Sequence, residues 1–202
     1  MSFGPNGERV QAPPPVSVVG FVIAGGRSLR MGRDKALLPW GETDLLGHAL
    51  GRLRAITGDV RILSGSETRY LDRDATVVTD TLRDAGPLAG VLAGLASAGG
   101  RSGLFLAVDL PHVPVALLEQ LVSLAQGYDA VVPVSPRGPE PLCAVYGAGC
   151  LDPIRGRVKR GDLKMTSFWP DVRVREMPPE ELRAFGEVAE LFRNLNTPED
   201  VG

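Results

Sequence analysis

The sequence lacks most of the features that mark secreted or membrane-bound proteins. Its 202 residues include only two cysteines, Cys143 and Cys150, and they form no C-x-x-C pair. Two thiols are too few for a disulfide framework at this length, so we expect a reducing compartment. No apolar run reaches the roughly 18 residues that a membrane helix needs. The N-terminus has no basic flank or cleavage site of a signal peptide, so we expect a cytoplasmic protein that binds no membrane.

A strong charge of one sign is also missing. The formal net charge at pH 7 is -2, from 22 Lys and Arg against 24 Asp and Glu. This balance argues against a dedicated nucleic-acid binder, although it allows a local basic pocket. Residues 1–15 are rich in Gly and Pro, and we expect them to be a disordered lead-in. Residues 16–202 suit one domain with a core of its own.

Within that domain, short apolar segments alternate with segments of helical periodicity. The expected strands cover residues 18–24, 60–63, 76–79, 104–108, 130–134 and 142–146, with an edge strand at 172–174, and the expected helices cover 45–56, 88–96, 115–125 and part of 155–164. The strands show no inside–outside alternation, as is usual when both faces of a sheet are covered. The pattern predicts an α/β fold with a Rossmann-like, doubly wound, mostly parallel sheet and helices on both faces. In the second helix, Gly90 and Gly94 are expected to form a small face for close packing.

A glycine-rich, basic loop follows the first expected strand. Gly25 and Gly26 would let the backbone approach a phosphate closely, and the exposed N–H groups of such a turn form an anion nest. Positive charge suited to a triphosphate follows at Arg27, Arg30, Arg33 and Lys35. The loop is neither a Walker A motif nor a G-x-G-x-x-G motif. On spacing alone, a phosphate site and a flexible basic turn are equally good interpretations.

Two aspartates, Asp80 and Asp109, each follow an expected strand. Ligands of a doubly wound sheet bind at the carboxyl ends of its strands, and carboxylates there can hold a magnesium ion between phosphate oxygens. Either aspartate alone is better explained by a turn or a helix cap. Together with the basic loop, the pair favours a metal–phosphate site. Gly86 lies in a loop that opens a helix, whose N-terminus also suits an anion.

Five blocks of the chain, in order, resemble the signature of molybdenum cofactor guanylyltransferases. Residues 23–38 resemble L-A-G-G-x-S-x-R-M-G-x-D-K-A-L-L, residues 86–90 are G-P-L-A-G, residues 106–111 resemble its D-M-P segment, residues 141–146 resemble P-L-x-A-L-Y, and residues 192–200 resemble F-x-N-I-N-T-P-E-D. Many nucleotidyltransferases share the opening loop, but the combination with the closing block is much more specific. The resemblance covers about residues 18 to 201.

The resemblance implies a fold of the nucleotide-diphospho-sugar transferase type and a reaction. GMP would pass from GTP to molybdenum-molybdopterin, giving the guanine dinucleotide cofactor and pyrophosphate, with Mg²⁺ as cofactor. Carried over by position, the nucleotide site would contain Ile23, Ala24, Gly25, Gly26, Arg30, Lys35, Ser64, Asp80, Gly86 and Asp109. Lys35 and Asp109 would be catalytic, Asp109 would bind the metal, and Asn194 and Asn196 would belong to the acceptor site. The NTP-binding part would span about residues 16–112 and the acceptor-binding part about 113–202.

Several alternatives stay open. Ser64, or Gly65 in another alignment, stands where relatives carry an Asn, and no physical feature of the sequence reads guanine directly. A cytidylyltransferase or another small-acceptor nucleotidyltransferase of the same fold is therefore one alternative, and a non-catalytic nucleotide or cofactor carrier is another. The basic run at 155–164 suits an acceptor-phosphate pocket, a docking face for molybdoenzymes or other cofactor-synthesis proteins, or simply a solvated helix face. Asn194 and Asn196 could also satisfy local backbone groups.

Overall fold

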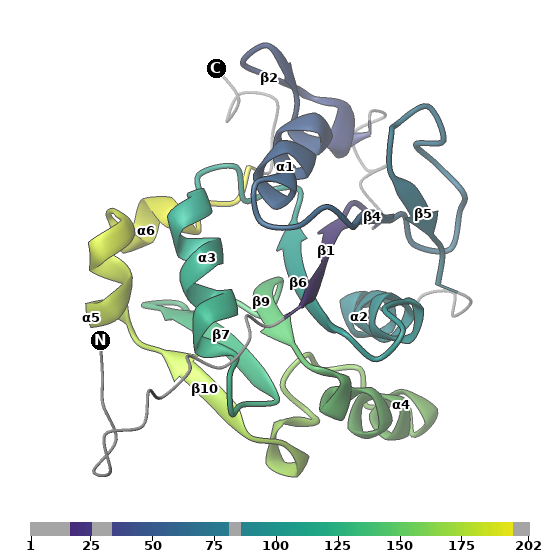
Figure 1. The fold of residues 1–202 in the computed structure, drawn as a ribbon, viewed down its shortest axis with the longest axis vertical. Helices are drawn as coiled ribbons and strands as arrows, with labels where there is room; N and C mark the ends of the chain where they lie inside the picture. The colour runs from purple at the N-terminus through teal and green to yellow at the C-terminus, as the bar shows by residue number, and fades with distance from the viewer. Residues whose placement is uncertain (1–16, 26–33, 81–85, 196–202) are drawn as a thin grey trace, which may run out of the picture.

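The fold is centred on one mixed sheet, seen in the computed structural model that describes residues 17–25, 34–80 and 86–195 (Figure 1). Its path is β10-β7-β9-β6-β1-β4-β5, with β8 paired to β7. The strands are β1 (Val18–Ile23), β4 (Val60–Leu63), β5 (Thr76–Val78), β6 (Ser102–Ala107), β7 (Ala130–Ser135), β8 (Gly138–Pro139), β9 (Cys143–Tyr146) and β10 (Val174–Met177). The lead-in at 1–15 lies outside the described residues.

The central strands are parallel, as predicted. β1 pairs in parallel with β4 and β6, β4 pairs with β5, and β7 pairs with β10. β9 is the exception among the long strands, because it runs antiparallel to both β6 and β7. The mostly parallel, doubly wound sheet is therefore confirmed.

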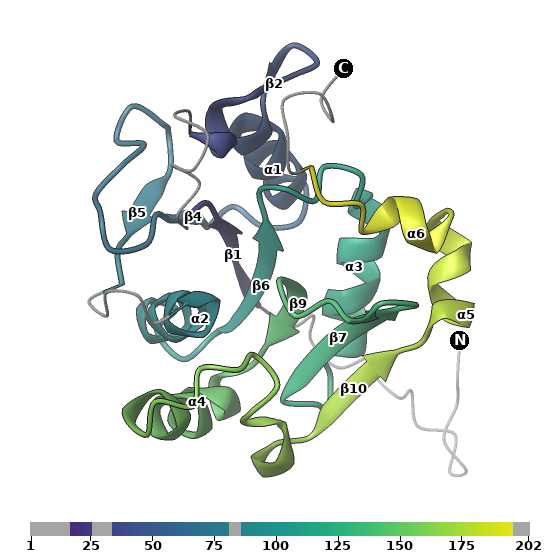
Figure 2. The ribbon, with the colours of Figure 1, turned by 180° about the vertical axis from the view of Figure 1, so that it is seen from behind.

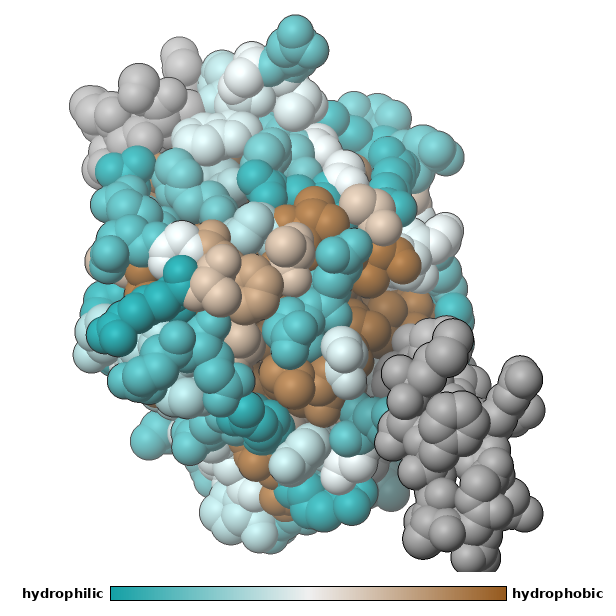
Figure 3. Space-filling model, turned by 60° about the vertical axis from the view of Figure 1, so that its left-hand side comes forward, coloured by the Kyte–Doolittle hydropathy of each residue, from teal (hydrophilic) through white to brown (hydrophobic). Residues whose placement is uncertain are grey.

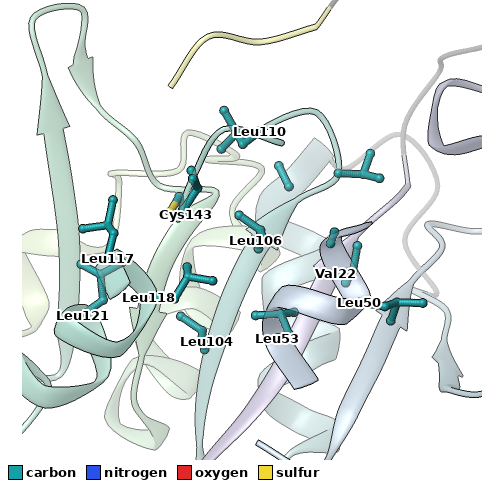
Figure 4. Close-up of a cluster of buried hydrophobic side chains, with 14 of the residues drawn as sticks. Val22, Leu50, Leu53, Leu104, Leu106, Leu110, Leu117, Leu118, Leu121 and Cys143 are labelled. Atoms are coloured by element: carbon teal, nitrogen blue, oxygen red, sulfur yellow. The ribbon is translucent and has the colours of Figure 1, made fainter. Parts of the chain in front are cut away.

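Helices cover both faces of the sheet (Figures 1 and 2). One core lies under α1 (Leu45–Arg54), α3 (Val115–Leu124), α5 (Pro179–Leu182) and α6 (Val188–Leu191), and the other lies under α2 (Gly86–Ser97) and α4 (Leu151–Lys159). Every residue of β1 is buried, which explains the absence of alternation in its sequence. Figure 4 shows the first core, where side chains of β1 and β6 meet leucines of α1 and α3.

Aromatic rings fill the second core. Phe21 stacks on Phe105 with ring centroids 4.9 Å apart, and Tyr146 packs edge-on to Phe105 at 5.6 Å. Gly94 of α2 lies against this group, since an added Cβ would come within 2.9 Å of the Phe105 ring. Gly90 has no atom within 4 Å of such a Cβ. The expected close packing is therefore confirmed at Gly94 and wrong at Gly90.

Two elements differ in their bounds from the sequence prediction. The edge strand expected at 172–174 is β10, which begins at Val174 opposite Ala130 of β7. The basic helix expected within 155–164 is α4, which begins at Leu151 and ends at Lys159. Its end is fixed by Gly161, whose φ of 74° allows the N–H groups of residues 161 and 162 to bond back to the carbonyls of residues 158 and 157.

A short hairpin was not predicted at all. It consists of β2 (Pro39–Trp40) and β3 (Thr43–Asp44), directly before α1, and Asp44 caps that helix by accepting from the N–H of Gly47 at 2.8 Å.

The surface agrees with the balanced composition. On the side that carries α5 and α6, hydrophilic side chains surround a smaller hydrophobic area (Figure 3). Among the helices of the described residues, none has the length and apolarity that crossing a bilayer would take.

Candidate active site

The carboxyl ends of four parallel strands form one edge of the molecule. Backbone bonds join the turns that follow these strands: Val108 N–H to Ile23 O at 3.1 Å, Ala24 N–H to Leu63 O at 2.9 Å, Ser64 N–H to Val78 O at 3.2 Å, and Asp80 N–H to Gly65 O at 2.9 Å. Most of the residues predicted for the nucleotide site that the structure describes are thus brought together at this edge. Ligands of doubly wound sheets bind in the same place.

The backbone of Gly25 lies very close to the backbone of the turn after β4. A Cβ added to it would lie 2.6 Å from the backbone nitrogen of Gly65 and 2.8 Å from its Cα. Any side chain larger than hydrogen would therefore push the turn after β1 away from the turn after β4. The sequence predicted a close backbone approach here, and within the described residues that approach is made by a neighbouring turn.

Lys35 and Asp109 form an ion pair at this edge. Lys35 begins the 3₁₀ helix η2 (Lys35–Leu37), which Asp34 caps by accepting from Ala36 N–H at 3.1 Å. The Lys35 ammonium lies 3.0 Å from Asp109 Oδ2, and the two side chains are 17% and 28% exposed. A cation and a carboxylate are thus held together at this edge, and both are partly open to solvent.

Asp109 is also bonded to Leu195, the last of the described residues. Its carbonyl accepts from the N–H of Leu195 at 3.2 Å. The neighbouring Arg193 lies 3.2 Å from His112 Nε2, and Arg137 donates to the carbonyl of Phe192. These three contacts hold the segment that contains the exposed Asn194, and its neighbour Leu195 is bonded to the backbone of Asp109.

A second carboxyl group lies near Asp109. Burial raises the pKa of Glu140 above its ordinary value; Ser135 and Arg137 oppose this rise, and the charge of Asp109 adds to it. Glu140 sits in the loop after β8 and carries no sequence signal that separates it from other loop acids.

The remaining predicted residues are placed less directly. Ser64 is buried, and its hydroxyl donates to the carbonyl of Glu67 at 2.7 Å, so its side chain is engaged within its own turn. Gly86 is the first residue of α2, with φ of 66°. Gly26, Arg30 and Asn196 lie outside the described residues.

Two further residues at this edge were not predicted from the sequence. Arg69 and Tyr70, in the loop between β4 and β5, both contact Asp34 and the turn after β1. Neither belongs to a periodic segment or a recognisable motif.

The basic run lies elsewhere. Figures 1 and 2 show α4 near the end of the molecule opposite the carboxyl ends of β1 and β6. Arg155 pairs with Asp152, and Arg157 pairs with Asp171 on the surface. These contacts favour the solvated helix face over an acceptor-phosphate pocket.

The donor set at the edge fits a magnesium ion. The described residues contain no group of three or more His, Cys, Asp or Glu that could hold a metal by themselves. Mg²⁺ is usually held by one or two carboxylates together with substrate phosphates and water. The partly exposed carboxylate of Asp109 suits that arrangement.

The class of protein follows from the fold and from the ligand-binding edge, and solved structures agree with it. The crystal structure of 2-C-methyl-D-erythritol 4-phosphate cytidylyltransferase from Thermus thermophilus shares the fold, with a TM-score of 0.67 at 19% identity over 92% of this chain and 96% of that chain. The chain therefore has the fold of nucleotidyltransferases.

More similar proteins narrow the class to a family. Residues 20–171 match the MobA-like NTP transferase domain. A probable molybdenum cofactor guanylyltransferase from Pelotomaculum thermopropionicum is 35% identical over 92% of this chain and 91% of its own length. The crystal structure of molybdopterin-guanine dinucleotide biosynthesis protein A from Archaeoglobus fulgidus has a TM-score of 0.76 at 26% identity, covering 90% of this chain and 94% of that chain. The chain belongs to the MobA-like family of molybdenum cofactor guanylyltransferases and is a nucleotidyltransferase enzyme.

Proposed function

We propose that the protein transfers GMP from GTP to molybdenum-molybdopterin, forming molybdopterin guanine dinucleotide and releasing pyrophosphate. The observation that carries the proposal is the Lys35–Asp109 pair at the carboxyl edge of β1 and β6. The closing segment, residues 192–195, is bonded to Asp109 through Leu195. The names of the relatives support guanine and molybdopterin as the substrate pair.

In the proposed reaction, an oxygen of the acceptor's terminal phosphate attacks the α-phosphorus of GTP in line with the leaving group. The new bond forms to the α-phosphorus as its bond to the bridging oxygen breaks, and pyrophosphate leaves with that electron pair. The acceptor phosphate is already anionic, so the protein supplies no obligatory base. Its task is to position two anions that repel each other and to stabilise the developing charge.

The residues of the edge have separate roles in this proposal. The Lys35 ammonium neutralises the triphosphate, and Asp109 holds Mg²⁺. When bound, the ion supplies further positive charge at the phosphate oxygens. Ile23 at the end of β1 and the turn residues Ala24 and Gly25 line the nucleotide site. Ser64, Asp80 and Gly86 also belong to it. The hydroxyl of Ser64 is engaged within its turn, so its contribution would come from its backbone.

Three wider expectations are part of the proposal. The nucleotide part would extend over about residues 16–112 and the acceptor part over about 113–202, with Asn194 at their junction. The reaction would take place in the cytoplasm, as cysteine usage suggests. Delivery of the product to a molybdoenzyme or another cofactor-synthesis protein is a prediction as well.

The first test is thermal stabilisation of the purified protein by GTP, CTP, ATP and UTP, each with and without Mg²⁺. A ligand at about a hundred times its Kd stabilises the folded state by about 2.7 kcal/mol. For a chain of this size that is a rise in Tm of about 5–10 °C. A magnesium-dependent shift specific to GTP supports the proposal, whereas a preference for CTP moves the protein to the cytidylyl branch.

The second test is pyrophosphate release in the presence of GTP, Mg²⁺ and the pterin acceptor. The proposal requires release that depends on all three. Nucleotide binding without such release would instead support the carrier alternative.

A further inference from the structure

The loop between β4 and β5 contacts the start of η2 through one carboxylate. Asp34 Oδ2 accepts from the hydroxyl of Tyr70 at 2.7 Å and from a guanidinium nitrogen of Arg69 at 3.1 Å. Its other oxygen, Oδ1, accepts from the N–H of Ala36. Asp34 directly precedes Lys35, so these bonds fix the backbone from which the Lys35 side chain extends.

The same two residues also hold the strand-end turns. A second guanidinium nitrogen of Arg69 lies 3.4 Å from the carbonyl oxygen of Ala24 and 3.2 Å from that of Ser64. The Tyr70 hydroxyl oxygen lies 3.3 Å from the carbonyl oxygen of Ala24. Arg69 and Tyr70 therefore join three segments of the edge: the turn after β1, the turn after β4 and the start of η2.

The backbone of Tyr70 is held in an uncommon conformation. Its φ is 64°, the one positive value that the described residues show outside glycine. A bulky residue adopts this region at an energetic cost, and such residues cluster at functional sites. The conformation directs a buried hydroxyl at Asp34, and burial, with the Asp34 bond, raises the pKa of Tyr70 so that it stays a donor.

We infer that Arg69 and Tyr70 are positioning residues, which act through Asp34 to set the place of Lys35 against Asp109. This inference rests on the proposed function, because Lys35 is taken to contact the triphosphate. Displacing a catalytic group by about 1 Å can cost as much as a hundredfold in rate. Loss of one of several bonds to Asp34 should therefore slow turnover without unfolding the protein.

The chain provides a matched control in the same loop. Arg73 pairs with Asp44 at 2.5 Å, and their side chains are 25% and 16% exposed, against 24% and 18% for Arg69 and Asp34. The Arg73–Asp44 pair ties the loop to the start of α1. Among the described residues, the Arg73 side chain pairs with Asp44 and Asp72, and with no residue of η2 or of the strand-end turns. A purely structural role would make Arg69→Met and Arg73→Met equivalent.

The experiment compares Tyr70→Phe, Arg69→Met and Arg73→Met in the full chain. We expect kcat to fall about tenfold in the first two variants and to change less than about twofold in Arg73→Met. In a Lys35→Ala background, Tyr70→Phe should change turnover by less than about twofold, because its effect passes through Lys35. A full tenfold loss in that background, or an equal loss in Arg73→Met, would overturn the inference.

A second readout needs no substrate. Hydrogen exchange of the Ala36 amide, which donates to Asp34, should become about tenfold faster in Tyr70→Phe and Arg69→Met and stay unchanged in Arg73→Met. Unchanged exchange in both Asp34-contacting variants would refute the positioning role, and Tyr70→Phe serves if Arg69→Met does not fold. If wild-type protein transfers no nucleotide, the proposed function fails, and the exchange of Ala36 still decides whether these residues hold η2.

Discussion

The ammonium of Lys35 lies 3.0 Å from the carboxylate of Asp109, across 74 residues of sequence. A partly exposed pair of this kind contributes only about 0–1 kcal/mol to folding. Stability therefore does not account for its position at the meeting point of η2, the end of β6 and the closing segment. The roles proposed above, a cation for the triphosphate beside a carboxylate for its metal, do account for it.

Replacing either member should impair catalysis far more than folding. We expect Lys35→Ala and Asp109→Ala each to lower turnover at least about a hundredfold, since each removes a strong electrostatic contact to the reacting phosphates. The free energy of unfolding, from urea titration, should change by about 1 kcal/mol or less. Near-normal turnover in either purified variant removes that residue from the mechanism.

The ion pair of Arg61 and Asp59 is the control for the Lys35 and Asp109 variants. Its N–O distance is 2.8 Å, and its side chains are 17% and 33% exposed, close to the values for Lys35 and Asp109. Asp59, however, lies at the amino end of β4, away from the site. Asp59→Ala should leave turnover unchanged.

Gly25→Ala should separate two turns of the nucleotide site. The new methyl group would lie 2.6 Å from the backbone nitrogen of Gly65, where no flexible side chain can move aside. We expect a loss of about 1–3 kcal/mol of stability, typical of overpacking. Stabilisation by GTP should also disappear, because the displaced turn carries the amides proposed to face the phosphates.

Gly51→Ala is the matched control for that substitution. Gly51 lies inside α1, and nothing comes within 4 Å of an added Cβ. Alanine there should raise stability by about 0.5–1 kcal/mol through its helix propensity and leave GTP binding intact. Equal GTP-induced shifts in both variants would show that the approach of Gly25 to Gly65 does not shape the site.

The strands could be predicted well because strands buried on both faces have continuously apolar sequences. The prediction for β4 matches its bounds, and those for β1 and β5 extend one residue too far. The direction of β9 was also predictable in principle. Only residues 136–142 separate β7 from β9, and a parallel crossover needs about a dozen residues or more.

From the residues alone, the candidate site was predictable at the strand ends, in the basic loop after β1 and at the start of α2. Asp80 and Asp109 could be found because each comes directly after an apolar run. Arg69, Tyr70 and Glu140 could not, since they lie in loops whose course is set by tertiary contacts.

The two glycines of α2 could not be told apart from the sequence either. Replacing each with alanine tests the packing directly. An added Cβ at Gly94 would lie 2.9 Å from the Phe105 ring, which cannot yield because it is buried between Phe21 and Tyr146. Gly94→Ala should therefore cost about 1–3 kcal/mol of stability. Gly90→Ala, on the same helix with open space, should add about 0.5–1 kcal/mol. Urea titration of the two variants gives the comparison, and a stabilised Gly94→Ala would contradict the packing.

The two histidines beside the site should make stability depend on pH. Arg52 Nε–H donates to His48 Nε2 at 2.8 Å, and Arg193 lies 3.2 Å from His112 Nε2. Burial lowers the pKa of both rings, and the neighbouring arginine charges lower it further, although the Pro111 carbonyl opposes the effect at His48. Both rings therefore stay neutral in the folded protein at pH values where the unfolded chain already takes up protons.

The sign of the effect follows from that difference. Below the ordinary histidine pKa of about 6.5, the unfolded chain binds more protons, so the free energy of unfolding falls as pH falls towards the lowered folded values. Wild-type protein should lose more stability between about pH 7.5 and about pH 5.5 than the double variant His48→Gln, His112→Gln, whose amides do not titrate. The sequence contains only these two histidines, and most carboxyl groups titrate lower, so the comparison isolates them. Urea titrations at both pH values measure it, and equal losses in the two proteins would show that neither ring is held neutral by the fold.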